Sequence, residues 1–521
     1  MPSPPPQPGR VILVGAGPGD PGLITVRGSQ WLARADAILY DYLVNPRLLQ
    51  VARAECQLIC LGKHQKPGQS QNIGGAGLPQ RLWTQDEINR RFIELAQEGK
   101  TVVRLKSGDP AIFGRLAEET AALDAAGIAY EIVPGITAAM AAGSHAGVWI
   151  TNRDQASAVA LITGHEKDDK GGSSLDYAAL ARFPGTLVFY MGVTTVGEWS
   201  TALIAAGKPA TTPVMIVRRC SWPDQLVLAS RLDRVAEDLK QAQLRPPMIL
   251  IVGEVATDAS TANWFMSRPL FGKKVLVTRA EEQSASLVER LSELGADCTV
   301  QPTITIGPPT DWKPVDDALR GASQYHWIVF SSANGVRAFC ERLWHLGLDG
   351  RALKNAKLAA IGPGTAEALA ANHLHADLLP AEYRAESLAE ALIATRHGDL
   401  RFQRILLIRA SRGREVLAEQ LTNAGAWVDQ VVAYTSTDVE QFELGIVEQL
   451  DRGDFDWVTV TSSAIARNLV RLGGEALRHT RLASISPITS GVLRELGHEP
   501  AAEATEYTIE GLVHAILKSS V

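Results

Sequence analysis

Cysteine is scarce in this sequence of 521 residues, which contains only five. They are scattered and odd in number, which does not fit a disulfide framework. The closest pair, Cys56 and Cys60, has no second pair of cysteines or histidines near it, so we predict no metal site. Reduced, buried thiols are typical of the cytoplasm, which is the compartment that we expect. The full set is Cys56, Cys60, Cys220, Cys298 and Cys340.

The sequence also lacks an excess of positive charge and any apolar run of membrane-spanning length. Its formal net charge is -6, which argues against nucleic acid as the main partner. An anionic small molecule held by local arginines stays compatible with that charge. Residues 1–9 are rich in proline and carry no apolar core, so we expect a disordered tail and not a signal peptide.

What the sequence does contain is a regular alternation of strand-like and helical segments. Hydrophobic residues make up 46% and charged residues 21%, as in globular proteins. Alternating strands and helices predict α/β layers, and the length predicts several domains. The expected strands lie at 102–105, 130–133, 159–163, 186–191, 214–217 and 248–252, and the expected helices include 113–126 and 195–206.

The second half of the sequence repeats itself. A strand leads into a Ser-Ser turn at 326–333 and again at 456–464, and shorter strand-turn units follow at 358–365 and 482–489. This pattern predicts two similar lobes. The serine hydroxyls are good helix N-caps. They also stand where parallel strands end, an edge that commonly binds ligands and suits carboxylates. Both interpretations remain open at this stage.

A glycine-rich turn, Gly15 to Asp20, follows the apolar run Val11 to Val14 near the start of the chain. A dinucleotide-binding fingerprint would need G-x-G-x-x-G opening directly into a helix. Here Pro18 and the pair Pro21-Gly22 interrupt that spacing. Taken alone, the turn is either a structural turn or a ligand-binding loop.

Three further segments decide between these readings, because each joins a strand end to a turn. They are Leu39 to Val44, which contains Asp41, then Val103 to Pro110, and then Val133 to Ala139. Together with the glycine turn, and in this order, they resemble the tetrapyrrole methyltransferases, specifically the uroporphyrinogen-III C-methyltransferases. The resemblance covers about residues 10–256.

The resemblance implies that S-adenosylmethionine is the methyl donor, held between subdomains of about 10–134 and 135–258 within a methyltransferase domain of 10–258. It also implies that Asp41 accepts a proton and Lys63 donates one. Loss of a ring proton after carbon methylation makes a carboxylate base chemically sensible. The cofactor positions implied by the match are Pro18, Ser107, Gly108, Asp109, Ile112, Thr137, Ala138, Met191 and Cys220.

The sequence departs from this family at several points. Ser107 replaces a usual glycine, so we expect a strained positive φ there. Asn152 replaces the usual histidine before Arg153. The segment Gln65–Trp83 is longer than the usual loop and flanks Lys63.

Residues from about 273 onward resemble uroporphyrinogen-III synthase, through Phe330 to Val336, Ala360 to Thr365, Val431 to Tyr434 and Ile485 to Thr489. The resemblance implies a two-lobed, flavodoxin-like α/β fold over 273–521 after a linker at 259–272. Lobe one is expected at 273–306 plus 440–521, and lobe two at 312–432. The implied cleft residues are Ser331, Ser332, Thr365, Ser462, Ser463 and Tyr434, the last assisting departure of the hydroxyl.

Three arginines after the strand at 405–408, namely Arg409, Arg412 and Arg414, either bind carboxylates or belong to a solvated turn.

The expected activity is bifunctional. The C-terminal half closes hydroxymethylbilane to uroporphyrinogen III, and the N-terminal half methylates it twice to precorrin-2, for sirohaem or cobalamin. We expect tetrapyrrole substrates as partners, with no nucleic acid or membrane, and a homodimer through the methyltransferase half. The alternatives are a methyltransferase acting on another precorrin, a nucleic acid or a protein, and a non-catalytic sensor of anionic ligands.

Overall fold

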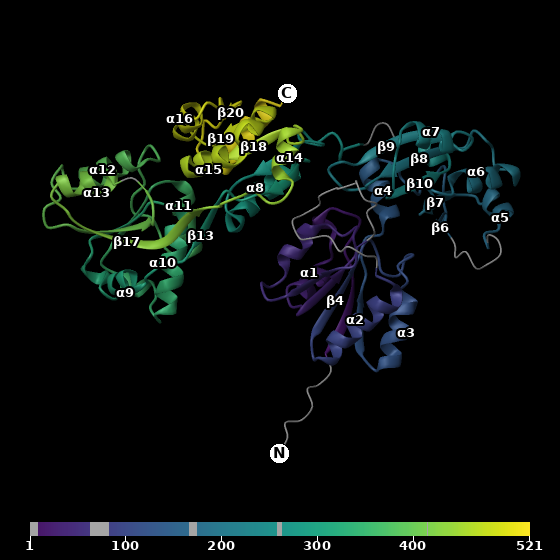
Figure 1. The fold of residues 1–521 in the computed structure, drawn as a ribbon, viewed down its shortest axis with the longest axis horizontal. Coiled ribbons are helices and arrows are strands. Elements are labelled where there is room, and N and C mark those ends of the chain that lie inside the picture. The colour runs from purple at the N-terminus through teal and green to yellow at the C-terminus, as the bar shows by residue number, and fades with distance from the viewer. Residues whose placement is uncertain (1–8, 63–82, 166–173, 258–262, 414, 521) are drawn as a thin grey trace, which may run out of the picture. The chain divides into compact units, whose positions relative to one another are not determined.

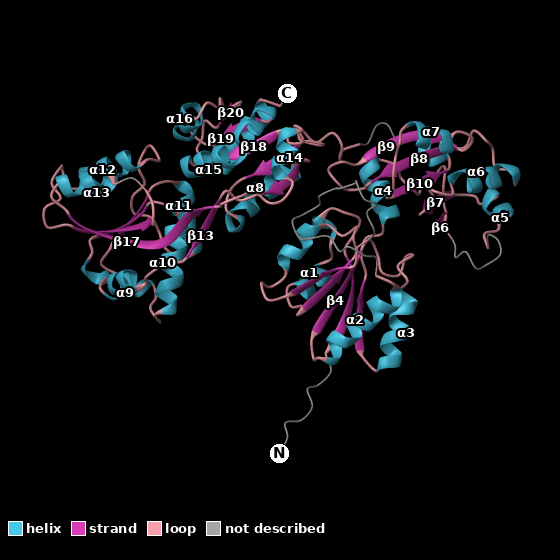
Figure 2. Ribbon diagram, in the orientation of Figure 1, coloured by secondary structure: helices cyan, strands magenta, loops and turns pink. Residues whose placement is uncertain are grey.

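The structure is a computed structural model of the chain, and it describes residues 9–62, 83–165, 174–257, 263–413 and 415–520. It divides into two compact units (Figures 1 and 2). Unit one comprises Met1–Gly272 and Leu294–Asp297, and unit two comprises Lys273–Glu293 and Cys298–Val521. Each unit is built on a pair of five-stranded sheets. Lys63, Arg414, the tail before Gly9 and nearly all of the 65–83 segment lie outside the described residues.

The first sheet of unit one is entirely parallel, in the order β3-β2-β4-β1-β5. Alternate residues of β1 face opposite sides of the sheet: Val11 and Leu13 join one buried cluster, and Ile12 and Val14 join another. Helices α2 and α3 cover one face and α1 the other (Figure 2). The elements are β1 Arg10–Gly15, α1 Val26–Leu32, β2 Ala37–Tyr40, β3 Gln57–Cys60, α2 Gln85–Gln97, β4 Thr101–Lys106, α3 Leu116–Ala126 and β5 Ala129–Val133.

Helix α3 begins later than the sequence indicated. The expected helix starts at residue 113, whereas the observed one starts at Leu116. Phe113 and Arg115 have φ values of 52° and 56°, in the left-handed region, so neither can extend a right-handed helix. The 107–115 segment is therefore a long turn at the carboxyl edge of the sheet.

The second sheet of unit one is mixed, in the order β6-β7-β10-β8-β9. Strands β6 and β7 are parallel, and β10 and β8 continue the sheet in antiparallel pairs. The strands expected at 159–163 and 248–252 are confirmed. The elements are α4 Ala138–Ala146, β6 Val159–Thr163, α5 Tyr177–Ala181, β7 Thr186–Tyr190, α6 Val196–Ala205, β8 Pro213–Arg218, β9 Leu226–Arg231, α7 Val235–Gln241 and β10 Met248–Val252.

The described part of the expected linker is packed against unit one. Phe265 is 1% exposed, and its ring centroid lies 4.8 Å from that of His145 on α4. The indole N–H of Trp264 donates to the carbonyl of Ser144 over 2.9 Å. Aromatic burial of this size makes residues 263–271 part of the fold and not a free tether.

Unit two has a first lobe around a sheet in the order β12-β11-β18-β19-β20. Its strands β11, β18, β19 and β20 are parallel. The elements of this lobe are β11 Lys274–Val277, α8 Glu281–Glu293, β12 Asp297–Val300, α14 Ile446–Asp451, β18 Trp457–Val460, α15 Ser463–Gly473, β19 Arg481–Ser484, α16 Pro487–Glu495, β20 Ala502–Glu503 and α17 Ile509–Lys518.

The second lobe is built on the sheet β13-β17-β16-β14-β15. Its edge strand β13 pairs antiparallel with β17 over residues 304–307, and Ile304 also packs into the core of the first lobe. The elements are β13 Ile304–Gly307, α9 Lys313–Arg320, β14 Trp327–Phe330, α10 Ala333–His345, β15 Lys357–Ala360, α11 Pro363–Ala371, α12 Ala385–Ala394, β16 Arg404–Ala410, α13 Val416–Asn423 and β17 Trp427–Asp438.

Candidate functional site

Three turns of unit one meet where β1, β4 and β5 end. Their backbones approach so closely that a Cβ atom on Gly15 would lie 2.5 Å from the nitrogen of Gly135. A Cβ atom on Gly135 would overlap the carbonyl oxygen of Gly108. Gly17 and Gly108 exchange backbone hydrogen bonds of 3.2 and 2.8 Å. Only glycine fits at Gly15 and Gly135, because any side chain there would collide with the backbone of a neighbouring turn.

The strain expected at Ser107 is absent. The residue with positive φ in this turn is Gly108, at 71°, and Ser107 is not among the residues of positive φ in the described chain. Serine therefore replaces the usual glycine at a position whose backbone conformation any residue can adopt.

Asp109 ties two of these turns together. Its Oδ2 accepts a hydrogen bond of 2.9 Å from the amide of Gly135, and its Oδ1 accepts one of 2.8 Å from the amide of Ala111. Each carboxylate oxygen of Asp109 therefore accepts one hydrogen bond from a backbone amide of the protein. The side chain therefore stabilises the turn.

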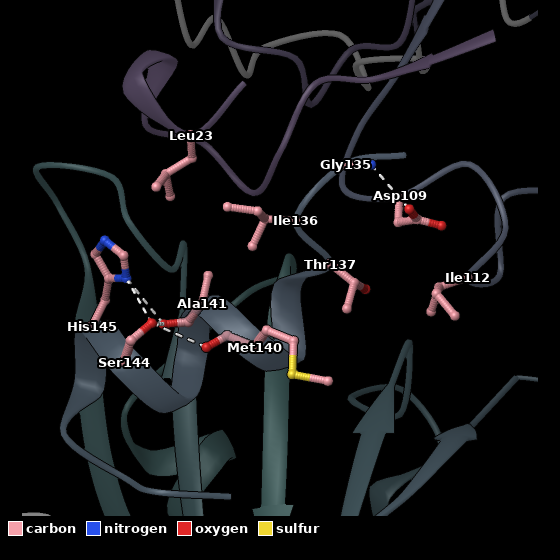
Figure 3. A pocket seen from close by; sticks show the side chains of 10 residues that line it. All are labelled: Leu23, Asp109, Ile112, Gly135, Ile136, Thr137, Met140, Ala141, Ser144 and His145. Atoms are coloured by element: carbon pink, nitrogen blue, oxygen red, sulfur yellow. Dashed lines mark hydrogen bonds between the residues drawn. The ribbon is translucent and has the colours of Figure 1, made fainter. Parts of the chain in front are cut away.

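A pocket of about 590 Å³ opens beside Asp109 (Figure 3). Of the cofactor positions expected from the sequence, it includes Asp109, Ile112 and Thr137. The other lining residues come from helix α4 and from the turns before it. The complete lining is Leu23, Asp109, Ile112, Gly135, Ile136, Thr137, Met140, Ala141, Ser144 and His145.

Tyr190 holds the start of helix α4 at this pocket, a role that the sequence did not reveal. Its hydroxyl lies 2.7 Å from Thr137 Oγ1 and accepts a hydrogen bond of 2.9 Å from the amide of Ala139. Burial raises the pKa of Tyr190, so the hydroxyl stays protonated and can donate to Thr137. Its place at the end of β7, directly before Met191, was the available clue.

The remaining expected cofactor positions do not line this pocket. Met191 is 51% exposed and has a φ of 52°, a strained conformation of the kind found at functional turns. Ala138 packs against the buried cluster under α4. Cys220 is 5% exposed inside that cluster, and burial raises the pKa of its thiol. The thiol therefore acts as a core side chain in this structure.

The loop after β8 fastens the glycine turn. The indole N–H of Trp222 donates to the carbonyl of Pro18 over 3.2 Å, and Ser221 Oγ accepts from the amide of Asp20 over 3.0 Å. Ser221 has a φ of 63°, so the fastening loop is itself strained. This contact joins residues 204 positions apart, a pairing that the sequence pattern cannot reveal.

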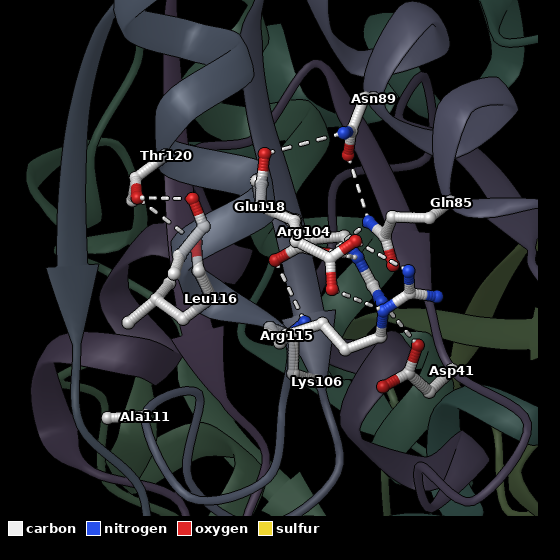
Figure 4. Close-up of polar contacts among 12 residues, drawn as sticks. Asp41, Gln85, Asn89, Arg104, Lys106, Ala111, Arg115, Leu116, Glu118 and Thr120 are labelled. Carbon is white, nitrogen blue, oxygen red and sulfur yellow. Dashed lines mark hydrogen bonds and ion pairs between the residues drawn. The ribbon is translucent and has the colours of Figure 1, made fainter. Parts of the chain in front are cut away.

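Asp41 lies at the end of β2, and its carboxylate is held from two sides (Figure 4). Its Oδ1 is 2.6 Å from Arg104 Nη2. Its Oδ2 accepts a hydrogen bond of 3.3 Å from the amide of Ser107, in the same turn as Gly108 and Asp109. The side chain is 32% exposed, so one edge of the carboxylate still reaches solvent or substrate.

Behind Asp41 lies a buried network of alternating charge. Arg104 Nε is 3.0 Å from Glu119, whose other carboxylate oxygen is 2.8 Å from Lys106 Nζ. Burial opposes the charge on Arg104, yet the carboxylates of Asp41 and Glu119 hold its pKa above the ordinary value. Burial and the neighbouring guanidinium lower the pKa of Lys106. The sequence offered one hint, since Arg104 and Lys106 interrupt an apolar strand.

In unit two, Ser332 and Tyr434 are brought together as the sequence predicted for a common site. Their hydroxyl oxygens are 2.9 Å apart, and Ser332 also caps α10 by accepting from the amide of Gly335 over 3.1 Å. Ser331 donates to the carbonyl of Ile408. The capping interpretation is thus confirmed for Ser332, and the tyrosine contact adds to it.

The equivalent turn of the other lobe is also a cap. Ser462 accepts from the amide of Ile465 over 3.2 Å, and Ser463 is the first residue of α15. Thr365 is buried in α11, 6% exposed. Ser332 and Ser462 cap corresponding helices, α10 after β14 and α15 after β18, which confirms the internal repeat.

Two of the three arginines after β16, for which carboxylate binding and a solvated turn were both left open, are paired within the chain. Arg409 bonds to Glu415 and Gln430. Arg412 lies 2.6 Å from Asp438 and bonds to Ser436. In this structure both therefore stabilise the turn after β16.

Within the described ranges, no group of three or more His, Cys, Asp or Glu side chains could hold a metal ion. Across the same part of the chain, no helix is both long and apolar enough to cross a membrane.

Comparison with known proteins matches each half of the chain to a protein family. Residues 10–236 match the model of the tetrapyrrole (corrin/porphyrin) methylases, and residues 285–514 match that of uroporphyrinogen-III synthase HemD. A solved uroporphyrin-III C-methyltransferase from Thermus thermophilus, complexed with S-adenosyl homocysteine, is 36% identical. It covers 48% of this chain and 99% of its own, with a TM-score of 0.40.

A curated relative matches along nearly the whole chain. The porphyrin biosynthesis protein HemD of Ruminiclostridium josui is 32% identical over 97% of this chain and 95% of its own length. A uroporphyrinogen-III C-methyltransferase of Bacillus subtilis is 40% identical over 68% of this chain and 69% of its own. The chain therefore belongs to the family of porphyrin-biosynthesis proteins that join a tetrapyrrole methylase to a uroporphyrinogen-III synthase.

Proposed function

We propose that unit two closes hydroxymethylbilane to uroporphyrinogen III and that unit one methylates this product twice, giving precorrin-2. The observation that carries the methylation step is the meeting of three glycine turns beside a pocket and next to Asp41. The product of one half is then the substrate of the other. The match of a single relative along 97% of the chain supports both activities in one protein.

The pocket suits S-adenosylmethionine. Its volume of about 590 Å³ lies within the range of small-molecule sites, and Gly135 contributes to its lining without a side chain. Asp109, Ile112, Gly135 and Thr137 would hold the cofactor, with Pro18, Gly108, Ala138 and Met191 around them. When bound, the cofactor supplies an electrophilic methyl group.

Asp41 is the proposed proton acceptor of the methylation. A pyrrole carbon that gains a methyl group must lose a proton, and a carboxylate at the edge of the site can take it. Arg104 and the amide of Ser107 fix the orientation of this carboxylate through bonds to both of its oxygens. Lys63 is the proposed proton donor on the strength of the family resemblance.

The proposed ring closure depends on positioning more than on a strong acid or base. The linear tetrapyrrole is flexible and closes spontaneously without inverting a ring, so the protein must hold the inverted arrangement. Tyr434, held by Ser332, would assist departure of the hydroxyl. Ser331, Thr365, Ser462 and Ser463 would line the same site.

Several finer points belong to the proposal as well. They are the domain bounds 10–258 and 273–521, a cytoplasmic location, a homodimer through the methyltransferase half, and sirohaem or cobalamin as the end product. Because both halves match these family models, we favour the bifunctional activity over a methyltransferase with another methyl acceptor and over a ligand sensor without activity.

Each half can be tested with its own substrate. Hydroxymethylbilane alone should yield uroporphyrinogen III, identified by isomer-resolving chromatography after oxidation. Uroporphyrinogen III with S-adenosylmethionine should yield a product heavier by two methyl groups. Uroporphyrinogen I alone from the first reaction would refute the synthase assignment, and an unmethylated tetrapyrrole from the second would refute the methyltransferase assignment.

A further inference from the structure

His145 lies on α4 and lines the pocket beside Asp109, although the residue is only 6% exposed (Figure 3). Its ring centroid lies 4.8 Å from that of Phe265 and 5.3 Å from that of Trp264. These two aromatic contacts restrict rotation of the imidazole. The fold therefore sets the orientation of the ring before any ligand binds.

One ring nitrogen of His145 is used by the helix itself. Nδ1 lies 3.1 Å from the carbonyl oxygen of Ala141, one helical turn earlier, and 3.4 Å from Ser144 Oγ. Because a carbonyl oxygen can only accept a hydrogen bond, Nδ1 carries the proton of the neutral ring. The other nitrogen, Nε2, then has a free lone pair and is a hydrogen-bond acceptor.

No group among the described residues donates a hydrogen bond to Nε2 of His145. Nε2 is also not one of the fully buried polar atoms that lack a partner in the described chain, so it keeps some accessible surface. The space that His145 lines is the pocket. An acceptor in such apolar surroundings costs free energy unless a donor meets it, and a bound molecule can supply that donor.

The other polar side chains of the pocket are already engaged. The hydroxyl of Thr137 bonds to Tyr190, and Ser144 donates to a backbone carbonyl of α4. Asp109 accepts from two backbone amides and keeps lone pairs for further donors. Figure 3 shows Asp109 and His145 on opposite sides of the pocket. The pocket therefore offers an acceptor on each side to a ligand that carries donors at two places.

We propose that Nε2 of His145 accepts a hydrogen bond from an N–H group of the methyl donor, S-adenosylmethionine. This inference rests on the proposed function and adds a cofactor-binding residue that the family resemblance did not name. The cofactor suits two separated acceptors, because it has an adenine amino group at one end and an ammonium group at the other. Protonation of Nε2 turns the acceptor into a donor, so acid should weaken cofactor binding.

The surroundings of His145 keep the ring neutral near neutral pH. Burial lowers the pKa of His145 below its ordinary value of 6.5. Of the charged groups around it, Asp20 in the glycine-rich turn favours the protonated ring, and Arg268 after the Trp264–Phe265 pair opposes it. Nε2 is therefore available as an acceptor at pH values above the lowered pKa.

The test measures binding of S-adenosylhomocysteine to the full chain by titration calorimetry, so it does not depend on turnover. His145→Phe keeps an aromatic ring without an acceptor, and His145→Gln places an amide oxygen near the position of Nε2. The matched control is Trp264→Phe, which removes the 2.9 Å hydrogen bond to the carbonyl of Ser144 in the same turn of α4 and leaves Nε2 in place. A second probe, methylthioadenosine, lacks the ammonium group.

We expect His145→Phe to bind S-adenosylhomocysteine about tenfold more weakly than wild type, because a buried hydrogen bond to the ligand is lost. His145→Gln should recover most of the affinity, and Trp264→Phe should bind within about twofold of wild type. As the pH falls below 6.5, the affinity of wild type should decrease relative to that of His145→Gln. A similar loss with methylthioadenosine assigns the donor to the adenosine part, and a loss with S-adenosylhomocysteine alone assigns it to the ammonium group.

An affinity of His145→Phe within about twofold of wild type would overturn the inference. An equal loss in Trp264→Phe would also overturn it, because the packing of α4 would then account for the effect. If His145→Phe does not fold, the pH comparison decides, and parallel pH curves for wild type and His145→Gln would contradict the inference. Failure of the proposed function looks different: the wild type itself would bind no S-adenosylhomocysteine.

Discussion

The carboxylate of Asp41 and the guanidinium of Arg104 lie 2.6 Å apart, one partly exposed at a strand end and the other buried within the sheet. Arg104 in turn bonds to Glu119, which holds Lys106. The proposed base is thus the outermost member of a buried network of charges. Its orientation depends on residues that never reach the substrate.

Replacement of Asp41 by Asn should remove methylation and spare ring closure. The amide cannot accept a proton, so we expect the methylation rate to fall about 10²- to 10⁴-fold. The readout is the methylation of supplied uroporphyrinogen III, with isomer III formation measured on the same preparation. Asp36→Asn is the matched control, since Asp36 also bonds to an arginine and a backbone amide but at the opposite end of β2. An equal loss of methylation rate in the Asp41→Asn and Asp36→Asn variants would indicate that Asp41 has only a structural role.

Glu119→Gln should destabilise unit one. Glu119 is fully buried, and its loss of charge leaves Arg104 and Lys106 with too little negative charge around them. The expected cost is about 3–5 kcal/mol of unfolding free energy. Denaturant unfolding followed by hydrogen exchange would assign the loss to unit one. Glu118→Gln, on the surface beside Arg115, should change stability by less than about 1 kcal/mol. Similar behaviour of the two variants would contradict the account of the network.

A methyl group on Gly135 should close the cofactor site. The added Cβ would overlap the backbone of Gly108, so the turns must separate. Calorimetric titration with S-adenosylhomocysteine should detect no binding to Gly135→Ala. Gly197→Ala provides the control, because an added Cβ at that position in α6 meets nothing within 4 Å. Helix propensity predicts that this control is stabilised by up to about 1 kcal/mol. Unchanged binding to Gly135→Ala would refute the placement of the site.

Tyr434→Phe should slow ring closure and leave methylation unchanged. The substitution removes the hydroxyl that bonds to Ser332 but keeps the ring in the core. We expect closure to slow by up to about tenfold, as for the loss of one hydrogen bond. Steady-state rates with hydroxymethylbilane measure the effect. A rate equal to wild type would remove Tyr434 from the site.

Acidification should destabilise unit one through His145. Burial against the aromatic segment lowers the pKa of His145 below its ordinary value of 6.5. Below pH 6.5 the unfolded chain therefore binds a proton at His145 more readily than the folded chain does. The contribution of neutral His145 to the free energy of unfolding is fully present above pH 6.5 and is lost as the pH falls toward the folded pKa. His145→Phe keeps an aromatic ring at this position and removes the imidazole that titrates. The difference in melting temperature between the two proteins should therefore change below pH 6.5 and stay constant above it. A constant difference throughout would contradict the prediction.

The sequence predicted the elements that depend on local pattern. The strands at 159–163 and 248–252, the caps at Ser332 and Ser462, and the repeat of unit two all follow from residue type and spacing. The start of α3 was missed because left-handed residues at Phe113 and Arg115 leave no mark in hydrophobic periodicity. Contacts across long separations, such as Trp222 with Pro18 or Arg104 with Glu119, arise only once the strands are assembled. For the same reason the sequence could not show that Arg409 is already paired with Glu415.

The central claim is that one chain both closes and methylates the tetrapyrrole. The most direct measurement supplies the wild-type protein with hydroxymethylbilane and S-adenosylmethionine carrying a labelled methyl group, and follows the product by mass spectrometry. The account predicts a tetrapyrrole with two labelled methyl groups on the type III ring arrangement. Unmethylated uroporphyrinogen I as the sole product would contradict it.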